Sequence, residues 1–143
     1  MSGASNVGVV RMLWVAVREQ DVDAVVSLAD GDVVWEPTAL HGGRLHGRGD
    51  LRRHLSRLRA AGTLADAHPY SFEAVGDSVI VSGVLRLRRR DEGVVSLHRW
   101  WVYAVAAGKV VSASSHASRA DAVRAVRAAR GARRDAVRRQ RDA

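Results

Sequence analysis

The sequence predicts an α+β domain in which helices packed at the start of the chain support a curved antiparallel sheet. Three observations favour this class. Apolar residues recur with the helical period in the first part of the chain, they alternate with polar residues from residue 68 to residue 116, and a capping pattern, SRAD, opens a last helix at residue 118. Helices first and a meander of strands afterwards are typical of α+β folds.

Two short helices are predicted first. In residues 9–17, VVRMLWVAV, the apolar residues recur at i, i+3, i+4 and i+7, which places them on one helix face. Residues 21–32 repeat this signal, with Asp21 suited to cap the start and Gly31 suited to a left-handed stop.

A brief strand is predicted at residues 32–37, DVVWEP, because Pro37 has no amide hydrogen to continue a sheet. The glycines of residues 41–49 indicate a loop. Residues 50–62 follow as a third helix, with its leucines directed inward and its arginines outward.

The second part of the chain is predicted to be an antiparallel meander followed by a helix. Glycine-containing turns separate the alternating segments. The expected strands are residues 68–75, 78–88, 94–106 and 109–116. We predict one domain at residues 1–130 and a basic C-terminal extension at residues 131–143, frayed or disordered because it has little to bury.

Composition and charge exclude several classes of protein. The 143 residues suit one domain, and the absence of cysteine excludes disulfides, thiolate metal sites and cysteine nucleophiles. The net charge of +8 is concentrated at residues 118–143, where nine arginines stand against three aspartates. No aromatic residue accompanies those arginines, which argues against nucleic-acid binding. With no apolar run of membrane length and no signal-peptide pattern, we expect a cytoplasmic protein without a membrane segment.

The predicted hairpin around Ala107 and Gly108 allows the facing residues to be paired. A two-residue loop there would place Trp101 opposite Ser114, with Tyr103 opposite Ser112 and Arg99 opposite His116, all on one face. Large residues facing serines leave a hollow, which predicts a binding site for a hydrophobic small molecule. The other face carries His98, Trp100 and Val102, and we predict a homodimer interface there because an exposed Trp100 would be costly.

The order of several short motifs resembles a known family. The segments GDVVWEP, HGRGDLRRHL, VGDSVIVSG, WVYAVAAGKVV and SSHASRADAVRAV follow one another as in the nuclear transport factor 2-like superfamily. The resemblance covers about residues 5–130 and is strongest to the SnoaL-like polyketide cyclase and ketosteroid isomerase-like group. It implies a cone-shaped fold with an apolar pocket, commonly in a homodimer. The superfamily includes isomerases, cyclases, dehydratases, epoxide hydrolases and non-catalytic members, so the fold does not select among them.

The resemblance also implies a candidate base. Ketosteroid isomerases use an acidic residue directly before a proline after the first strand, and Glu36 and Pro37 hold that place here. The oxyanion-hole positions of those enzymes correspond to Leu13 and Trp101, which argues against ketosteroid isomerisation. The aspartate expected on the last strand of limonene-type epoxide hydrolases falls near Ser115, which argues against that reaction.

We therefore predict a cofactor-independent enzyme of the isomerase, cyclase or lyase type, acting on a hydrophobic, polyketide-like substrate. Glu36 would be the acid or base, because burial would raise its pKa, with His116 as a second catalytic group and no bound metal. The predicted substrate-binding residues are Leu13, Trp14, Leu55, Leu58, Arg99, Trp101, Tyr103 and Ser114.

Less specific alternatives remain open for each of these assignments. Glu36 would otherwise be a solvated strand-end carboxylate or a partner of Arg44 or Arg48, and His116 a hydrogen-bonded structural residue. The whole domain would then be a non-catalytic ligand-binding or dimerisation module.

Overall fold

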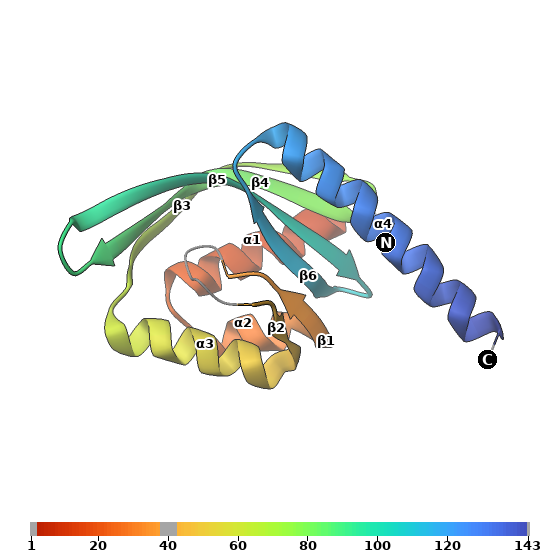
Figure 1. Ribbon diagram of the computed structural model, residues 1–143, viewed down its shortest axis with the longest axis horizontal. Coiled ribbons are helices and arrows are strands. Elements are labelled where there is room, and N and C mark those ends of the chain that lie inside the picture. Colours follow the sequence, from red (N-terminus) through yellow and green to blue (C-terminus); the bar gives the residue numbers. More distant parts are fainter. Residues whose placement is uncertain (1–2, 38–42, 143) are drawn as a thin grey trace.

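The computed structural model describes residues 3–37 and 43–142, which form a curved six-stranded sheet and four helices (Figure 1). The helices are α1 (Gly3–Arg18), α2 (Val22–Leu28), α3 (Gly47–Ala61) and α4 (Arg119–Asp142). The strands are β1 (Ala29–Trp35), β2 (Leu45–His46), β3 (Leu64–Val75), β4 (Ser78–Arg89), β5 (Gly93–Ala106) and β6 (Lys109–His116). The strand order is β2-β1-β6-β5-β4-β3, with β1 and β6 parallel and the other neighbours antiparallel. The predicted α+β class is confirmed.

Several boundaries differ from the sequence prediction for local reasons. The second helix ends at Leu28 and not at Gly31, because the backbone is already extended at Ala29, where pairing with β6 begins. The third helix starts at Gly47, before the predicted start at Asp50, whose carboxylate accepts the N–H of His46 at 3.2 Å and so satisfies a donor at the helix start. The strand β2 lies within the predicted loop, of which residues 41 and 42 are outside the described residues.

The sheet bends where β3 pairs with β4. The register shifts between Pro69 and Ser71, so Tyr70 is an extra residue, and Gly83 lies opposite this bulge. A Cβ atom at Gly83 would lie 2.6 Å from the carbonyl oxygen of His68, which means that the two strands approach too closely for a side chain. Bulges and strand glycines both permit bending. The concave side of the bent sheet faces α1, α2 and α3 (Figure 1).

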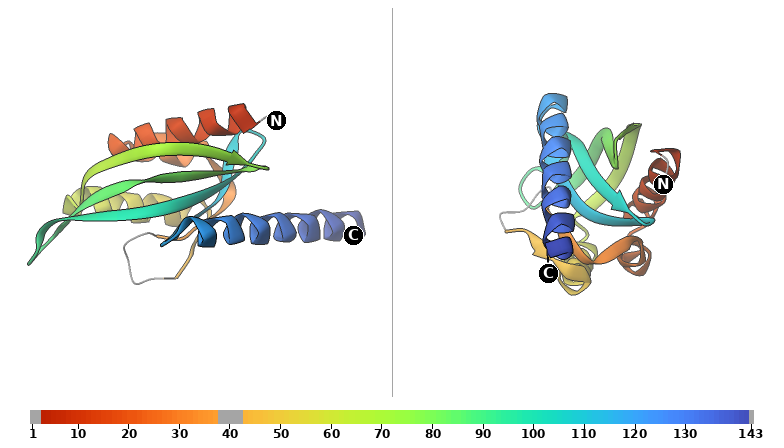
Figure 2. Two further views of the ribbon diagram at one scale, coloured as in Figure 1. Left: turned by 90° about the horizontal axis from the view of Figure 1, so that it is seen from above. Right: turned by 90° about the vertical axis from the view of Figure 1, so that its right-hand side faces the viewer.

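Two apolar clusters lie on opposite faces of β4 and β5. Val81 and Trp101 belong to the large core beneath the concave face, which includes residues of α1, α2 and α3. Ile80 and Val102 point the other way, where Ala122 and Val126 of α4 pack on them. This division follows from the alternation of side chains along a strand. Figure 2 shows α1 and α4 on opposite sides of the sheet.

The helix α4 packs on the sheet face that we expected to form a dimer interface. Val102 is buried under α4, and Trp100 packs against the same cluster, so the chain itself covers part of the face that we expected a second subunit to cover. Trp100 is therefore partly covered without a partner subunit. His98 remains exposed, with its ring stacked on Tyr70 at a centroid distance of 6.4 Å. The homodimer itself stays a prediction.

The helix α4 begins with two contacts to the body and then extends beyond it. Ser118 Oγ accepts the N–H of Asp121 at 3.1 Å, as the SRAD pattern predicts, and Arg119 Nη2 donates to both carboxylate oxygens of Glu73 at 2.6 and 2.9 Å. The helix continues past Gly131 to Asp142 and projects past the edge of the sheet (Figure 2). The domain division after residue 130 stays a prediction. Across residues 3–37 and 43–142, none of the helices is long and apolar enough to span a membrane.

Candidate functional site

A cavity of about 400 Å³ lies between the concave sheet face and the helices α1, α2 and α3. Its volume is in the range of small-molecule sites. Trp14 of α1 meets Trp101 of β5 edge to face, with ring centroids 4.9 Å apart, and Tyr103 lies near Trp35 at 6.1 Å. The rest of the wall is largely aliphatic and includes Val17, Val22, Val25, Leu64, Leu85 and Leu87.

Most of the site residues predicted from the sequence border this cavity. They are Glu36, Trp14, Leu55, Leu58, Trp101, Tyr103 and Ser114. Three others do not. Leu13 is fully buried in the core, Arg99 donates from Nε to Ser115 Oγ at 2.8 Å, and His116 shares a hydrogen bond with Ser114 through Nε2 at 2.8 Å. Leu13 is therefore a core residue and not part of the cavity wall, which corrects the prediction.

The predicted pairing between β5 and β6 is wrong by one residue. Val105 pairs with Val110, but Ala104 pairs with Ser112, so Val111 is an extra residue. Beyond this bulge Trp101 lies opposite Ser115, Tyr103 opposite Ala113, and Trp100 opposite His116. A one-residue shift moves every following side chain to the other face. The six residues that we expected on one face are therefore divided between the two faces.

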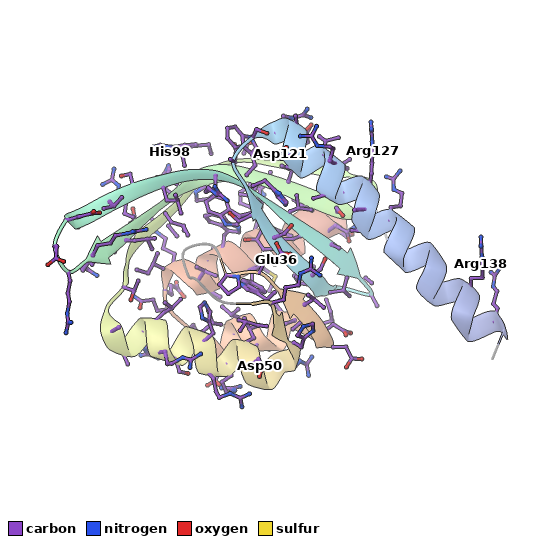
Figure 3. All side chains as sticks on the ribbon, in the orientation of Figure 1. Glu36, Asp50, His98, Asp121, Arg127 and Arg138 are labelled. Atoms are coloured by element: carbon purple, nitrogen blue, oxygen red, sulfur yellow. The ribbon has the colours of Figure 1, made fainter. Side chains whose placement is uncertain are left out.

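Glu36 follows β1 at the edge of the cavity. Its backbone N–H donates to the carbonyl oxygen of Ala113 at 2.9 Å, which fixes the start of its side chain beside β6. Its Oε1 accepts a hydrogen bond from Arg44 Nε at 2.9 Å, and the side chain is 38% exposed. Glu36 is thus less buried than the acid or base that we expected from the sequence would be. Its pairing with Arg44 matches the alternative in which Glu36 is an ion-pair partner of Arg44 or Arg48. Glu36 nevertheless borders the cavity (Figure 3).

His116 and Ser114 form a polar pair near Glu36. Burial lowers the pKa of His116, and the charge of Arg99 acts in the same direction, whereas the charges of Glu36 and Asp121 raise it. Because the first effect is the largest, the imidazole is predominantly neutral at neutral pH. Ser114 borders the cavity and His116 does not, so their hydrogen bond links the cavity wall to the imidazole of His116.

Trp14 brings an unpaired hydrogen-bond donor to the cavity wall. The side chain is 5% exposed, and among the described residues no acceptor is in hydrogen-bonding position for its Nε1–H. Tyr103 borders the same cavity. Burial raises the pKa of the Tyr103 hydroxyl, and the nearby indole N–H of Trp14 opposes this effect. The indole N–H of Trp14 and the hydroxyl of Tyr103 therefore lie close together beside the cavity.

His54 is a cavity residue that the sequence analysis missed. It lies on α3 between Leu51 and Leu58, and its side chain is buried. Burial lowers the pKa of His54 below the usual 6.5, and the nearby charge of Arg57 lowers it further. The helical spacing could have indicated this position, because His54 follows Leu51 by three residues and precedes Leu58 by four, which places it on the inward face of the helix.

The lowered pKa of His54 predicts a specific pH dependence of stability. The unfolded chain binds a proton at His54 more readily than the folded protein does. The contribution of neutral His54 to the unfolding free energy is therefore fully present above a pH of about 6.5, and it is lost as the pH falls toward the lowered folded-state pKa. His54→Leu should therefore reduce the loss of unfolding free energy between about pH 7.5 and pH 5 in urea titrations. His98→Gln, at an exposed position, is the control. Equal losses in the wild type and His54→Leu would contradict this prediction.

Metal ligands are not gathered at the cavity. Among residues 3–37 and 43–142, no group of three histidine, aspartate or glutamate side chains is arranged to hold a metal ion. The polar groups on the wall instead suit hydrogen bonding to an organic ligand.

The chain is thus an α+β protein whose bent sheet shelters an apolar cavity. It belongs to the SnoaL-like domain family, whose model matches residues 9–113. This confirms the resemblance that the sequence motifs indicated. No curated protein matches the chain.

Several solved structures share the fold. An NTF2-like protein of unknown function from Burkholderia pseudomallei has a TM-score of 0.69 and 23% identity, over 87% of this chain and 97% of that one. A putative polyketide cyclase from Sinorhizobium meliloti has a TM-score of 0.63 and 20% identity, over 76% of this chain and 94% of that one. An LEH-like epoxide hydrolase from M. tuberculosis has a TM-score of 0.68 and 18% identity, over 85% and 88%. These likenesses show the fold alone.

Proposed function

We propose that this protein is a cofactor-independent enzyme that binds a hydrophobic small molecule in the cavity and transfers a proton on it. The observation that carries the proposal is a largely apolar cavity whose wall brings the carboxylate of Glu36 together with Trp14 and Tyr103. The cavity thus offers an apolar site, a hydrogen-bond donor and a carboxylate, which together suit acid–base chemistry beside a substrate oxygen.

In the proposed reaction Glu36 acts as the base. It removes a proton from a carbon next to a substrate carbonyl, and the electron pair moves to the carbonyl oxygen. The hydroxyl of Tyr103 donates a hydrogen bond to that oxygen as its negative charge develops. Return of the proton to another carbon gives an isomer. Attack of the new carbanion on a second carbonyl of the same molecule closes a ring as the π bond of that carbonyl breaks, and the resulting alkoxide takes the proton back from Glu36.

The remaining predicted residues receive supporting roles in this proposal. His116 does not border the cavity, so we assign it as a positioning residue that acts through its hydrogen bond to Ser114. Arg99 fixes the neighbouring strand through Ser115. Leu55, Leu58 and Trp101 form apolar walls, and Ser114, whose hydroxyl bonds to His116, borders the cavity as well.

The substrate class rests on the related structures. A putative polyketide cyclase and an epoxide hydrolase share this fold, so catalysis on small organic molecules occurs among its neighbours. A polyketide-like ring system would match the aromatic and aliphatic wall. We also propose a cytoplasmic location and a homodimer that uses the exposed part of the outer sheet face around His98, with no nucleic acid or membrane as partner.

The second candidate is a non-catalytic ligand-binding module. The observation that favours it is the ion pair between Glu36 and Arg44, which occupies one carboxylate oxygen and leaves the group partly exposed. A module of this kind would bind the same apolar molecules without changing them.

The variant Glu36→Gln separates the two candidates. The assay follows deuterium uptake from heavy water at the carbon next to the carbonyl in a panel of cyclic ketones, by mass spectrometry. As a general base, Glu36 should contribute about 10²–10⁴-fold to the rate. The variant should lose that factor and still bind 1-anilinonaphthalene, an uncharged apolar fluorophore, with the affinity of the wild type.

Glu19→Gln is the matched control, because Glu19 is an exposed carboxylate that does not border the cavity. It should change neither exchange nor binding. Exchange that survives in Glu36→Gln would remove Glu36 as the base. Binding of the fluorophore without exchange of any panel member by the wild type would favour the binding module.

A further inference from the structure

The cavity wall carries more arginines than carboxylates. Four arginines border it where the C-terminal end of α3 faces the hairpin between β4 and β5, on the left of Figure 1: Arg59, Arg88, Arg89 and Arg90. The described wall includes two carboxylates, Glu36 and Asp21. Glu36 pairs with Arg44, and Asp21 accepts the N–H of Ala24 at 3.1 Å at the start of α2. The arginines therefore outnumber the acids, and both acids already have partners.

One of the four arginines has a structural role. Arg88 donates from Nη1 to the carbonyl oxygens of Gly62 and Leu64, at 3.0 and 3.2 Å, and so ties β4 to the chain that follows α3. The other three arginines have no such structural role among the contacts of the described residues. Across the described part of the chain, the exposed side chains of Arg59, Arg89 and Arg90 form no ion pair within 4.0 Å.

The position of these three arginines distinguishes them from ordinary solvated surface charges. They stand at the mouth of an apolar cavity, where low-dielectric walls focus their electric field. A guanidinium group binds carboxylate, sulfonate and phosphate oxygens with paired hydrogen bonds, and these are stronger than hydrogen bonds between neutral groups. An anion at the mouth would therefore find charge complementarity that the protein itself does not provide.

We propose that the ligand of this cavity is an amphipathic organic acid, whose apolar body fills the chamber and whose anionic group binds Arg59, Arg89 and Arg90. The inference rests on the proposed function and names its substrate class. Anchoring at this end would direct the far end of the molecule toward Trp14 and Glu36, so the arginines would act as positioning residues for proton transfer.

Two fluorophores that differ in a single group test this proposal. 8-Anilinonaphthalene-1-sulfonate carries an anionic sulfonate, and 1-anilinonaphthalene has the same rings without it. The wild type should bind the anionic probe about tenfold more tightly, as expected for one charge-assisted contact at a partly exposed site. Added salt should weaken only the anionic probe. The variant Arg59→Gln/Arg89→Gln/Arg90→Gln should lose the tenfold preference and bind the neutral probe unchanged.

A second triple variant controls for net charge. Arg86→Gln/Arg127→Gln/Arg138→Gln removes the same charge from residues that do not border the cavity, and Arg127 and Arg138 lie on α4 (Figure 3). It should keep the preference for the anionic probe. Leu58→Trp, which fills the cavity, should weaken both probes and so confirm where they bind.

Other outcomes would overturn either the anion site alone or the binding cavity as well. Equal affinity of the wild type for both probes, or an equal loss in the two triple variants, would overturn the anion site and leave the proposed function intact. Failure of both probes to bind the wild type would overturn the binding cavity itself, and with it both proposals. Circular dichroism of each variant, compared with the wild type, verifies that the loss is one of binding and not of folding.

Discussion

Replacing Leu13 by alanine is expected to lower the free energy of unfolding by about 2–5 kcal/mol, because its side chain is fully buried in the core and the protein can refill only part of the space. Met12, the preceding residue on α1, is 60% exposed. Met12→Ala should therefore change stability by less than about 0.5 kcal/mol. Urea unfolding followed by circular dichroism measures both variants.

This comparison also tests the placement of Leu13. A cavity-wall residue would affect ligand binding more than folding, whereas a core residue would affect folding directly. A loss of less than about 1 kcal/mol in Leu13→Ala, accompanied by weaker binding of 1-anilinonaphthalene, would show that Leu13 belongs to the cavity after all. The structure predicts the opposite pattern, with a large loss of stability.

A methyl group at Gly83 is expected to destabilise the sheet by about 1–3 kcal/mol. Its Cβ would meet the carbonyl oxygen of His68 at 2.6 Å and the Cα atom of Pro69 at 3.0 Å. Both atoms belong to the backbone of β3, so the contact can be relieved only by moving β3 away from β4. Thermal and urea unfolding of Gly83→Ala provide the measurement.

The control for Gly83→Ala should change stability in the opposite direction. Gly8 lies inside α1, and a Cβ atom there would have no neighbour within 4 Å. Gly8→Ala is therefore expected to stabilise the protein by about 0.5–1 kcal/mol, since alanine loses less conformational entropy in a helix. If both variants were neutral, the close approach of β3 and β4 would be wrong.

The Gly83 variant also bears on function, because the cavity depends on the bend of the sheet. Straightening β3 against β4 would change the separation between Leu85 of the sheet and the helices on the other side of the cavity. We expect Gly83→Ala to weaken binding of 1-anilinonaphthalene as well as stability, whereas Leu13→Ala should mainly affect stability.

The class of fold could be predicted because its signals are local. Helical and alternating periodicities depend on neighbouring residues, so the helices before Gly62 and the strands after it were predicted in the right order. The same locality explains why Trp14, Leu55 and Leu58 were placed correctly at the cavity, since each lies on the inward stripe of its helix. His54 lies on that stripe too and was missed because a histidine was not expected among leucines.

The chemistry of the site could not be predicted in the same way. The bulge at Val111 changes which residues of β6 face Trp101 and Tyr103, and a hairpin pattern alone does not specify it. Arg44, the partner of Glu36, lies eight residues further along the chain. The exposure of Glu36 therefore depends on where the fold places Arg44, which the local sequence does not specify.

The sequence by itself thus determined the elements and their order, because these follow from short-range patterns of apolar residues. The family was indicated by the order of several motifs along the chain. Tertiary structure alone decided that α4 covers Trp100 and Val102, that Arg44 pairs with Glu36, and that arginines from α3 and β4 gather at one mouth. Each of these depends on how separate segments of the chain pack together, and such contacts leave no periodic signal in either segment.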